Sequence, residues 1–173
     1  MLITCDCGHG GKDPGAIGHI GNTPINEKDF NLKIALLVKS FLINAGHEVQ
    51  ITRSSDVFVE LNDRVKMSNE FKSDLFISIH CDSNTDTAAH GYTVYYYSDN
   101  GRVWAQRVVI GLTMGVPLHN RGTDYGNFEV IRDTHCPAIL IECGFMSNQD
   151  DLIWLNSATN QIALAKCIAG AIK

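Results

Sequence analysis

The sequence predicts an α/β fold: a single twisted, mostly parallel sheet of about six strands with helices on both faces. Apolar runs alternate with amphipathic stretches along the 173 residues, and strands separated by helices favour parallel pairing through right-handed crossovers. The runs "LFISIH" at 75–80 and "AILIEC" at 138–143 are largely apolar, which is typical of strands covered on both faces. The length predicts one domain, residues 1–173.

The first half of the chain predicts three strands and two helices. The strands are Leu2–Asp6, Glu48–Arg53 and Leu75–His80, and the helices are Glu27–Ala45 and Leu61–Phe71. The first helix carries Phe30, Ile34 and Leu37 at helical spacing. We expect it to end before Gly46, because glycine readily adopts the left-handed conformation of a helix C-cap.

The second half predicts three further strands and two helices. The strands are Gly91–Tyr97, Phe128–Arg132 and Ala138–Cys143, and the helices are Gly101–Met114 and Ala158–Ile172, the last capped by Ser157. The polar segments 81–90 and 120–127 are expected to be loops.

Composition excludes several classes of protein. The net charge is −5, and the basic residues are scattered, so we expect no nucleic-acid partner. No apolar run approaches the ~20 residues of a membrane span, and the first residues lack a signal peptide. We therefore expect a soluble protein made in the cytoplasm. The six cysteines form no C-x-x-C pair and are interpreted as buried thiols of a reducing compartment.

The glycine-rich stretch "CDCGHGGKDPGA" at 5–16 follows the first strand. Its spacing matches neither of the common phosphate-binding patterns, and Lys12 is followed by Asp13 and Pro14, which do not open a phosphate-binding helix. The loop is therefore expected to present His9 rather than to hold an anion.

Three groups with metal or acid–base chemistry follow predicted strands. His9 comes after the first strand, His80 ends "LFISIH", and Glu142 lies near the end of "AILIEC". Because ligands bind at the carboxyl ends of parallel strands, these side chains should share one edge of the sheet. Two imidazoles, one carboxylate and an open position form a catalytic zinc site.

The residue types alone leave the third metal ligand open. Glu27 opens the long helix, but Glu129, Asp13 and Asp82 are alternatives. Cys7, two residues before His9, is a less favoured thiolate ligand.

Separate segments of the chain resemble one enzyme family. They are "DCGHGGKDPGA", "NEKDFNLKIA", "ITRSSD", "SIHCDSN", "RGTDYGNFEVIRDT" and "PAILIECGFMSNQDD". Together they are similar to the zinc-dependent N-acetylmuramoyl-L-alanine amidases, found as bacterial autolysins and as phage endolysin catalytic domains. The resemblance runs from Leu2 to the last helix, which implies that residues 1–173 form an amidase catalytic domain.

The resemblance implies a function and a set of site residues. His9, Glu27 and His80 would bind Zn²⁺, and Glu142 would be the catalytic carboxylate, acting as general base and acid toward a metal-activated water. The substrate would be peptidoglycan, cleaved at the amide between N-acetylmuramic acid and the L-alanine of the stem peptide. Alternatives are an inactive peptidoglycan-binding regulator and another zinc hydrolase, such as a carboxypeptidase or a sugar deacetylase.

Several features leave alternatives open. Asp82 stands where such amidases commonly carry an amide, and it is expected to shape the loop by a hydrogen bond. Glu142 is alternatively a buried acid paired with Arg132 or Arg64. Arg121 and Arg132 are candidates for binding a substrate carboxylate.

Location follows from the implied substrate, which lies outside the membrane. We expect release to the cell wall on lysis, as for a phage endolysin or a lytic autolysin. A C-terminal wall-binding module absent from this chain is also expected, because an acidic enzyme gains no attraction from an anionic wall.

Overall fold

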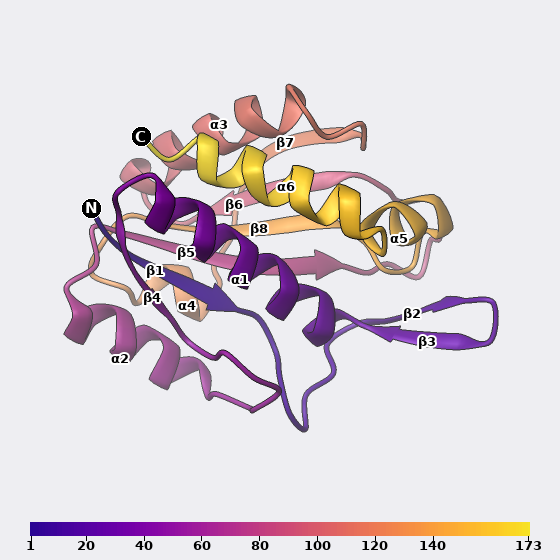
Figure 1. Cartoon of the computed structure of the whole chain (residues 1–173), viewed down its shortest axis with the longest axis horizontal. Helices are drawn as coiled ribbons and strands as arrows, with labels where there is room; N and C mark the ends of the chain where they lie inside the picture. The colour runs from indigo at the N-terminus through magenta and orange to yellow at the C-terminus, as the bar shows by residue number, and fades with distance from the viewer.

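A computed structural model describes all 173 residues of the chain. Its strands are β1 (Leu2–Cys7), β2 (Ile17–Ile20), β3 (Thr23–Asn26), β4 (Glu48–Ile51), β5 (Leu75–Asp82), β6 (Tyr92–Tyr96), β7 (Asn120–Tyr125) and β8 (Ala138–Phe145). Six of them form one sheet in the order β4-β1-β5-β8-β6-β7, and β2 and β3 form a separate antiparallel hairpin. The hairpin projects from the end of the molecule at which β1 and β5 finish (Figure 1).

Helices cover both faces of the sheet. They are α1 (Glu27–Asn44), α2 (Leu61–Phe71), α3 (Asp99–Thr113), α4 (Glu129–Arg132), α5 (Gln149–Leu155) and α6 (Ala158–Gly170). Helices α1, α3 and α6 pack on one face over a cluster of 29 buried residues, whereas α4 closes a cluster of five buried residues on the other. Helix α2 packs against β1 and α4 (Figure 1). The predicted α/β class, sheet size and two-sided covering are confirmed.

The strand order creates a crevice between β1 and β5. Strand β1 pairs in parallel with both β4 and β5, and β5 pairs in parallel with β8. Helix α1 connects β1 to β4 on one face, and α2 connects β4 to β5 on the other. The connections therefore diverge between β1 and β5, which is the usual ligand position in an open α/β sheet. Strand β6 runs antiparallel to β8 and parallel to β7, so β6 and β7 both run opposite to the other four strands.

Two segments differ from the sequence prediction. Phe128–Arg132 was expected to be a strand, but Glu129–Arg132 forms the short helix α4. Consecutive Val130 and Ile131 are both buried, which a helix achieves on one face and a half-buried strand does not. The expected loop at 120–127 contains β7, an exposed and polar edge strand that pairs only with β6. Its pattern lacks the apolar alternation that identifies a strand.

The ends of some other helices and strands agree with the prediction, whereas others differ from it. Helix α1 ends as expected, with Gly46 at a positive φ of 89°. Ser157 is the N-cap residue of α6, although its side chain makes no capping hydrogen bond. Strand β5 continues two residues beyond His80, and the β2–β3 hairpin and α5 were not predicted. None of the helices combines the length and the apolar character needed to cross a membrane.

Candidate metal centre and catalytic carboxylate

His9 lies in the loop that follows β1, in a left-handed conformation with φ of 59°. This region disfavours residues with a Cβ atom, so the surroundings must hold the loop in place. Buried Arg53 donates to the carbonyls of Cys7 (3.1 Å) and Gly8 (2.9 Å), and Arg64 donates to the carbonyl of His9 (2.9 Å). Two guanidinium groups thus fix three successive carbonyls of the loop.

Two glycines allow this loop to lie close to the other site residues. A Cβ on Gly8 would lie 2.3 Å from the imidazole of His80. A Cβ on Gly15, whose φ is +66°, would lie 2.5 Å from Glu27 Oε2 and 2.7 Å from the ring of His9. The glycines of this stretch therefore serve the close approach of side chains.

Glu27 is the first residue of α1 and is almost fully buried. The loop caps this helix directly, since the backbone N–H groups of Glu27 and Lys28 donate to the carbonyls of Ala16 and Pro14. The Glu27 carboxylate accepts hydrogen bonds from the backbone of Ala16 (2.9 Å) and Cys81 (3.0 Å) and from the Asn31 amide (3.0 Å). The helix N-terminus adds a favourable field for a negative charge.

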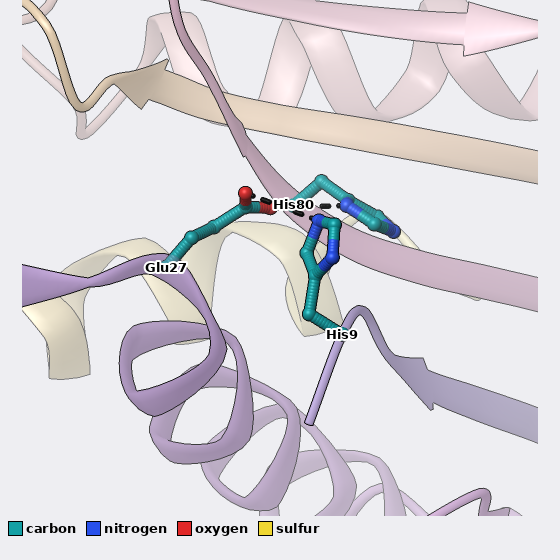
Figure 2. A group of neighbouring side chains, drawn as sticks. All are labelled: His9, Glu27 and His80. Atoms are coloured by element: carbon teal, nitrogen blue, oxygen red, sulfur yellow. Dashed lines mark hydrogen bonds and ion pairs between the residues drawn. The ribbon is translucent and has the colours of Figure 1, made fainter. Parts of the chain in front are cut away.

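The structure brings His9, Glu27 and His80 together, as Figure 2 shows. Glu27 Oε2 lies 3.1 Å from His9 Nε2, and Glu27 Oε1 lies 3.0 Å from His80 Nδ1. The three donor atoms lie within 4.8 Å of one another, so the group can hold a metal ion. Asp13 lies outside this group and instead contacts His9 Nδ1 at 2.7 Å. A carboxylate on the outer nitrogen commonly orients a metal-binding histidine.

The electrostatics of the group favour a cation. Burial opposes the charge on His9, but the carboxylates of Glu27 and Asp13 raise its pKa above the ordinary value. Burial also opposes the charge on Glu27, yet hydrogen bonds from His80 and His9 keep its pKa well below the usual range. A buried carboxylate that stays ionised beside two imidazoles suits a divalent ion that binds nitrogen and oxygen.

Glu142 lies beside this group on the neighbouring strand. In the parallel register of β5 and β8, His80 is opposite Glu142, so both side chains lie on the same face of the sheet. Glu142 Oε2 is buried and has no hydrogen-bond partner. Burial, followed by the charges of Glu27 and Asp82, raises the pKa of Glu142 well above its usual value.

The alternative that Glu142 is paired with an arginine is wrong. Arg64 forms an ion pair with Asp6 (2.8 Å), and Arg132 forms one with Asp133 (2.7 Å). A buried carboxyl oxygen without a partner is costly, so its presence at this position calls for a functional explanation.

Comparison with known proteins gives the family. The family model described as N-acetylmuramoyl-L-alanine amidase matches residues 3–173. This chain belongs to that amidase family. It is 36% identical over 171 residues to a probable cell wall amidase LytH of Staphylococcus epidermidis, covering 99% of the chain and 57% of that relative. The chain thus spans little more than half the length of the curated relatives it matches. The family and enzyme class implied by the resemblance are confirmed.

Solved amidase structures have the same fold. The catalytic domain of CwlV, an N-acetylmuramoyl-L-alanine amidase from Bacillus (Paenibacillus) polymyxa, superposes with a TM-score of 0.94 at 38% identity, covering 99% of this chain and 95% of that one. The amidase AmiC2 of Nostoc punctiforme also gives a TM-score of 0.94, at 37% identity and with 99% and 94% coverage.

The remaining candidate residues of this amidase-family chain have other contacts. The Cys7 thiol donates to the carbonyl of Arg53, and burial raises its pKa to about 12. Cys81 and Cys143 lie in the large cluster on the opposite face, as expected from strand alternation. Asp82 accepts a hydrogen bond from the backbone N–H of Ser83 (2.7 Å), which agrees with a loop-shaping role. Glu129 lies outside the three-residue group.

A cavity of about 340 Å³ adjoins the metal group on the β1 side. His9, His80 and Arg64 line it together with the apolar residues Phe58, Val59, Leu61 and Val130. The site is therefore open to a ligand next to the imidazoles, which are 25% (His9) and 18% (His80) exposed.

The sequence patterns do not identify the residues that support the loop. They give no role to Arg53 or Asn31, and they suggest Arg64 only as a partner of Glu142. A signal existed for Arg53, which is the last residue of the predicted strand Glu48–Arg53, where a charged side chain requires a partner. The partners are backbone carbonyls, and backbone acceptors carry no residue-specific signal.

Proposed function

We propose that residues 1–173 form one catalytic domain that hydrolyses the amide between N-acetylmuramic acid and L-alanine in peptidoglycan. We further propose that His9, Glu27 and His80 bind Zn²⁺ and that Glu142 is the catalytic acid and base. One observation carries the proposal: the convergence of two imidazoles and a carboxylate beside a buried carboxyl oxygen that has no partner. Membership of the amidase family supports the reaction class.

Each residue has a distinct task in this reaction. A bound zinc ion supplies Lewis acidity and lowers the pKa of water. Glu142 takes the proton of the attacking water and then delivers it to the leaving alanine nitrogen. Burial raises the pKa of Glu142 above its usual value, which makes its carboxylate a stronger base than that of an exposed glutamate. Asp13 fixes the orientation of His9.

Partners and location are part of the proposal. Peptidoglycan is the substrate, which requires the domain to reach the cell wall, by release on lysis if it is a phage endolysin or lytic autolysin. The greater length of the curated relatives supports a further module in the whole protein, for which wall binding is the proposed role.

The test is product analysis with purified cell wall. The wild-type protein should release peptides with new amino groups on L-alanine, and Glu142→Gln should lower turnover by about 10²- to 10⁴-fold while zinc still binds. Near-normal turnover in Glu142→Gln would remove Glu142 from the mechanism. Freed D-alanine or acetate would identify a carboxypeptidase or a deacetylase instead, and binding without any product would identify a regulator.

A further inference from the structure

Four aromatic side chains gather at the ends of β6 and β7 and before α4. We call Tyr95, Tyr97, Tyr125 and Phe128 the aromatic platform. The ring centres of Tyr95 and Phe128 are 5.2 Å apart in an edge-to-face arrangement, and those of Tyr97 and Tyr125 are 5.6 Å apart. A Cβ on Gly126 would lie 2.5 Å from the Phe128 ring and 3.1 Å from that of Tyr95. A side chain at Gly126 would therefore separate these two rings.

The platform is open to solvent although it is apolar. Tyr97 is 37% exposed, Phe128 41% and Tyr125 55%. Aromatic side chains contribute much binding energy when they are covered, and grouped exposed apolar side chains mark interaction sites. The fold alone does not require these rings at the surface.

Tyr95 places one end of the platform near the proposed catalytic centre. Strand β6 lies directly beside β8, with Thr93 opposite Glu142 and Tyr95 opposite Leu140. Thr93 and Tyr95 therefore lie on the same face of the sheet as Glu142. Burial, followed by the nearby charges of Asp82 and Glu142, raises the pKa of the Tyr95 hydroxyl. The platform thus begins on the strand next to Glu142, on the side away from the histidines. From Tyr95 it extends toward the start of β8, since Tyr96 is opposite Ile139 and pairs with Tyr125.

The two sides of the catalytic centre differ in shape and chemistry. On the β1 side lies the cavity of about 340 Å³, whose lining includes the buried ion pair of Asp6 and Arg64. On the β6 side lies the exposed platform. The scissile amide of the proposed function joins a sugar to a peptide, so the two parts of the substrate leave the reacting bond in different directions.

We propose that the aromatic platform binds the glycan strand of the substrate by stacking against saccharide rings, and that the stem peptide enters the cavity on the β1 side. This assignment rests on the proposed function. A glycan strand continues on both sides of the reacting unit, so it requires an open surface, whereas a stem peptide is a branch that fits a recess. Saccharide rings present C–H groups, which carry partial positive charge and match the negative face of an aromatic ring.

The first test compares two substrates of the zinc-loaded protein. One is a glycan chain of several disaccharides with stem peptides, and the other is a single N-acetylmuramic acid carrying the same peptide. For Tyr125→Ala, kcat/KM on the long substrate should fall on the order of 5- to 10-fold more than on the short one, mainly through KM. Tyr125→Phe keeps the ring and should restore the wild-type ratio. Ile110→Ala removes an exposed apolar side chain of α3 and is the matched control.

The second test measures binding without the reaction. Metal-free protein is titrated with a tetrasaccharide of N-acetylglucosamine, which has no peptide, and contacts are followed by NMR. Wild type and Ile110→Ala should show the same saturable shifts, centred on β6 and β7, and Tyr125→Ala should weaken this binding by about fivefold or more.

The outcomes separate this inference from the proposed function. If wild type releases no L-alanine amino groups from cell wall, the proposed function fails whatever the saccharide does. If wild type cleaves the wall but Tyr125→Ala keeps the wild-type substrate ratio and saccharide affinity, the glycan assignment is wrong. It is also overturned if the loss in Tyr125→Ala follows the length of the peptide instead of the number of sugars.

Discussion

The two faces of the central sheet use the same strands for different purposes. Facing α1, α3 and α6, the strands contribute a continuous apolar layer that includes Ile77, Ile79, Ile139 and Ile141. On the opposite face, the alternate positions of β5 and β8 include Ser78, His80 and Glu142. Because consecutive strand residues point to opposite faces, most of the hydrophobic stabilisation lies on one face and most of the chemistry on the other.

The face that carries His80 and Glu142, which we call the chemical face, also contributes to the stability of the fold. Beneath the site, the carboxylate of Asp6 accepts hydrogen bonds from Arg64 (2.8 Å), Thr52 (2.7 Å) and Ser78 (2.6 Å), all in the interior. Arg64 in turn holds the carbonyl of His9. This polar network stabilises the fold and positions a proposed metal ligand at the same time, so the two roles meet there.

The largest expected effect tests whether this polar network stabilises the folded protein. Asp6→Ala leaves the Arg64 charge buried without its ion-pair partner, so the free energy of unfolding in urea should fall by about 3–5 kcal/mol. Glu70→Ala removes an exposed i,i+4 pair with Lys66 and should change it by less than about 0.5 kcal/mol. Equal effects of the two substitutions would mean that the chemical face contributes little to stability.

The same network predicts a pH dependence. Burial disfavours the Asp6 charge, but Arg64 and the Ser78 hydroxyl outweigh it and lower the pKa of Asp6. A carboxyl whose pKa is lowered by folding stabilises the protein above its unfolded pKa, about 3.9, and loses that contribution as the pH falls through the folded pKa. Thermal unfolding should therefore show wild type losing more stability than Asp6→Asn as the pH falls below about 4.

The next prediction concerns the stability contributed by the apolar face of the sheet, which packs against α1, α3 and α6. Ile141→Ala removes a fully buried side chain of the large cluster, and it should lower the free energy of unfolding by about 2–5 kcal/mol. Because Ile141 points away from its neighbour Glu142, zinc affinity at low temperature should stay within about twofold of wild type. A large loss of zinc affinity in folded Ile141→Ala protein would show that the two faces are not separable.

A smaller effect concerns the outer contact of His9. Asp13→Asn removes the carboxylate charge beside Nδ1, and zinc affinity should fall by about 10- to 100-fold, measured by competition with a chelator. Asp99→Asn, an exposed carboxylate paired with Arg102, is the control and should leave the affinity unchanged. An unchanged affinity in Asp13→Asn would exclude Asp13 from orienting the ligand.

The smallest expected effect concerns the contribution of Glu142, the proposed acid and base, to the stability of the protein. Since the pKa of Glu142 is raised by folding, its contribution to stability is full below the unfolded pKa, about 4.3, and declines as the pH rises toward the folded pKa. Metal-free Glu142→Gln should therefore unfold at the same or a slightly higher temperature than wild type at pH 8. A clear loss of stability in this variant would assign Glu142 a structural role.

The sequence predicted the apolar parts of this architecture better than its polar parts. Strands such as β5 and β8 have apolar runs that identify them, and their shared carboxyl edge placed His80 beside Glu142 before the register was known. Glu27 depended on the family resemblance, because several carboxylates satisfied the same chemical requirement. The prediction was wrong for the polar edge strand β7 and the one-turn helix α4. Neither segment has an apolar periodicity long enough to distinguish a strand, a helix and a loop.

The aromatic platform shows a further limit of sequence analysis. Tyr95 lies on β6, which is distant in the chain from Tyr125 at the end of β7 and from Phe128 before α4. Their proximity depends on β6 pairing with β8 on one side and β7 on the other. Tertiary pairing of this kind follows from the whole topology and not from a local pattern.

The most direct test of the account is a calorimetric titration of metal-free protein with Zn²⁺, for wild type, His80→Ala and His90→Ala. We expect one zinc ion per chain for wild type and for His90→Ala, whose imidazole lies outside the metal group. For His80→Ala we expect a loss of at least 100-fold in affinity. If wild type shows no saturable binding, or if His80→Ala binds zinc as tightly as wild type, the proposed metal centre is wrong.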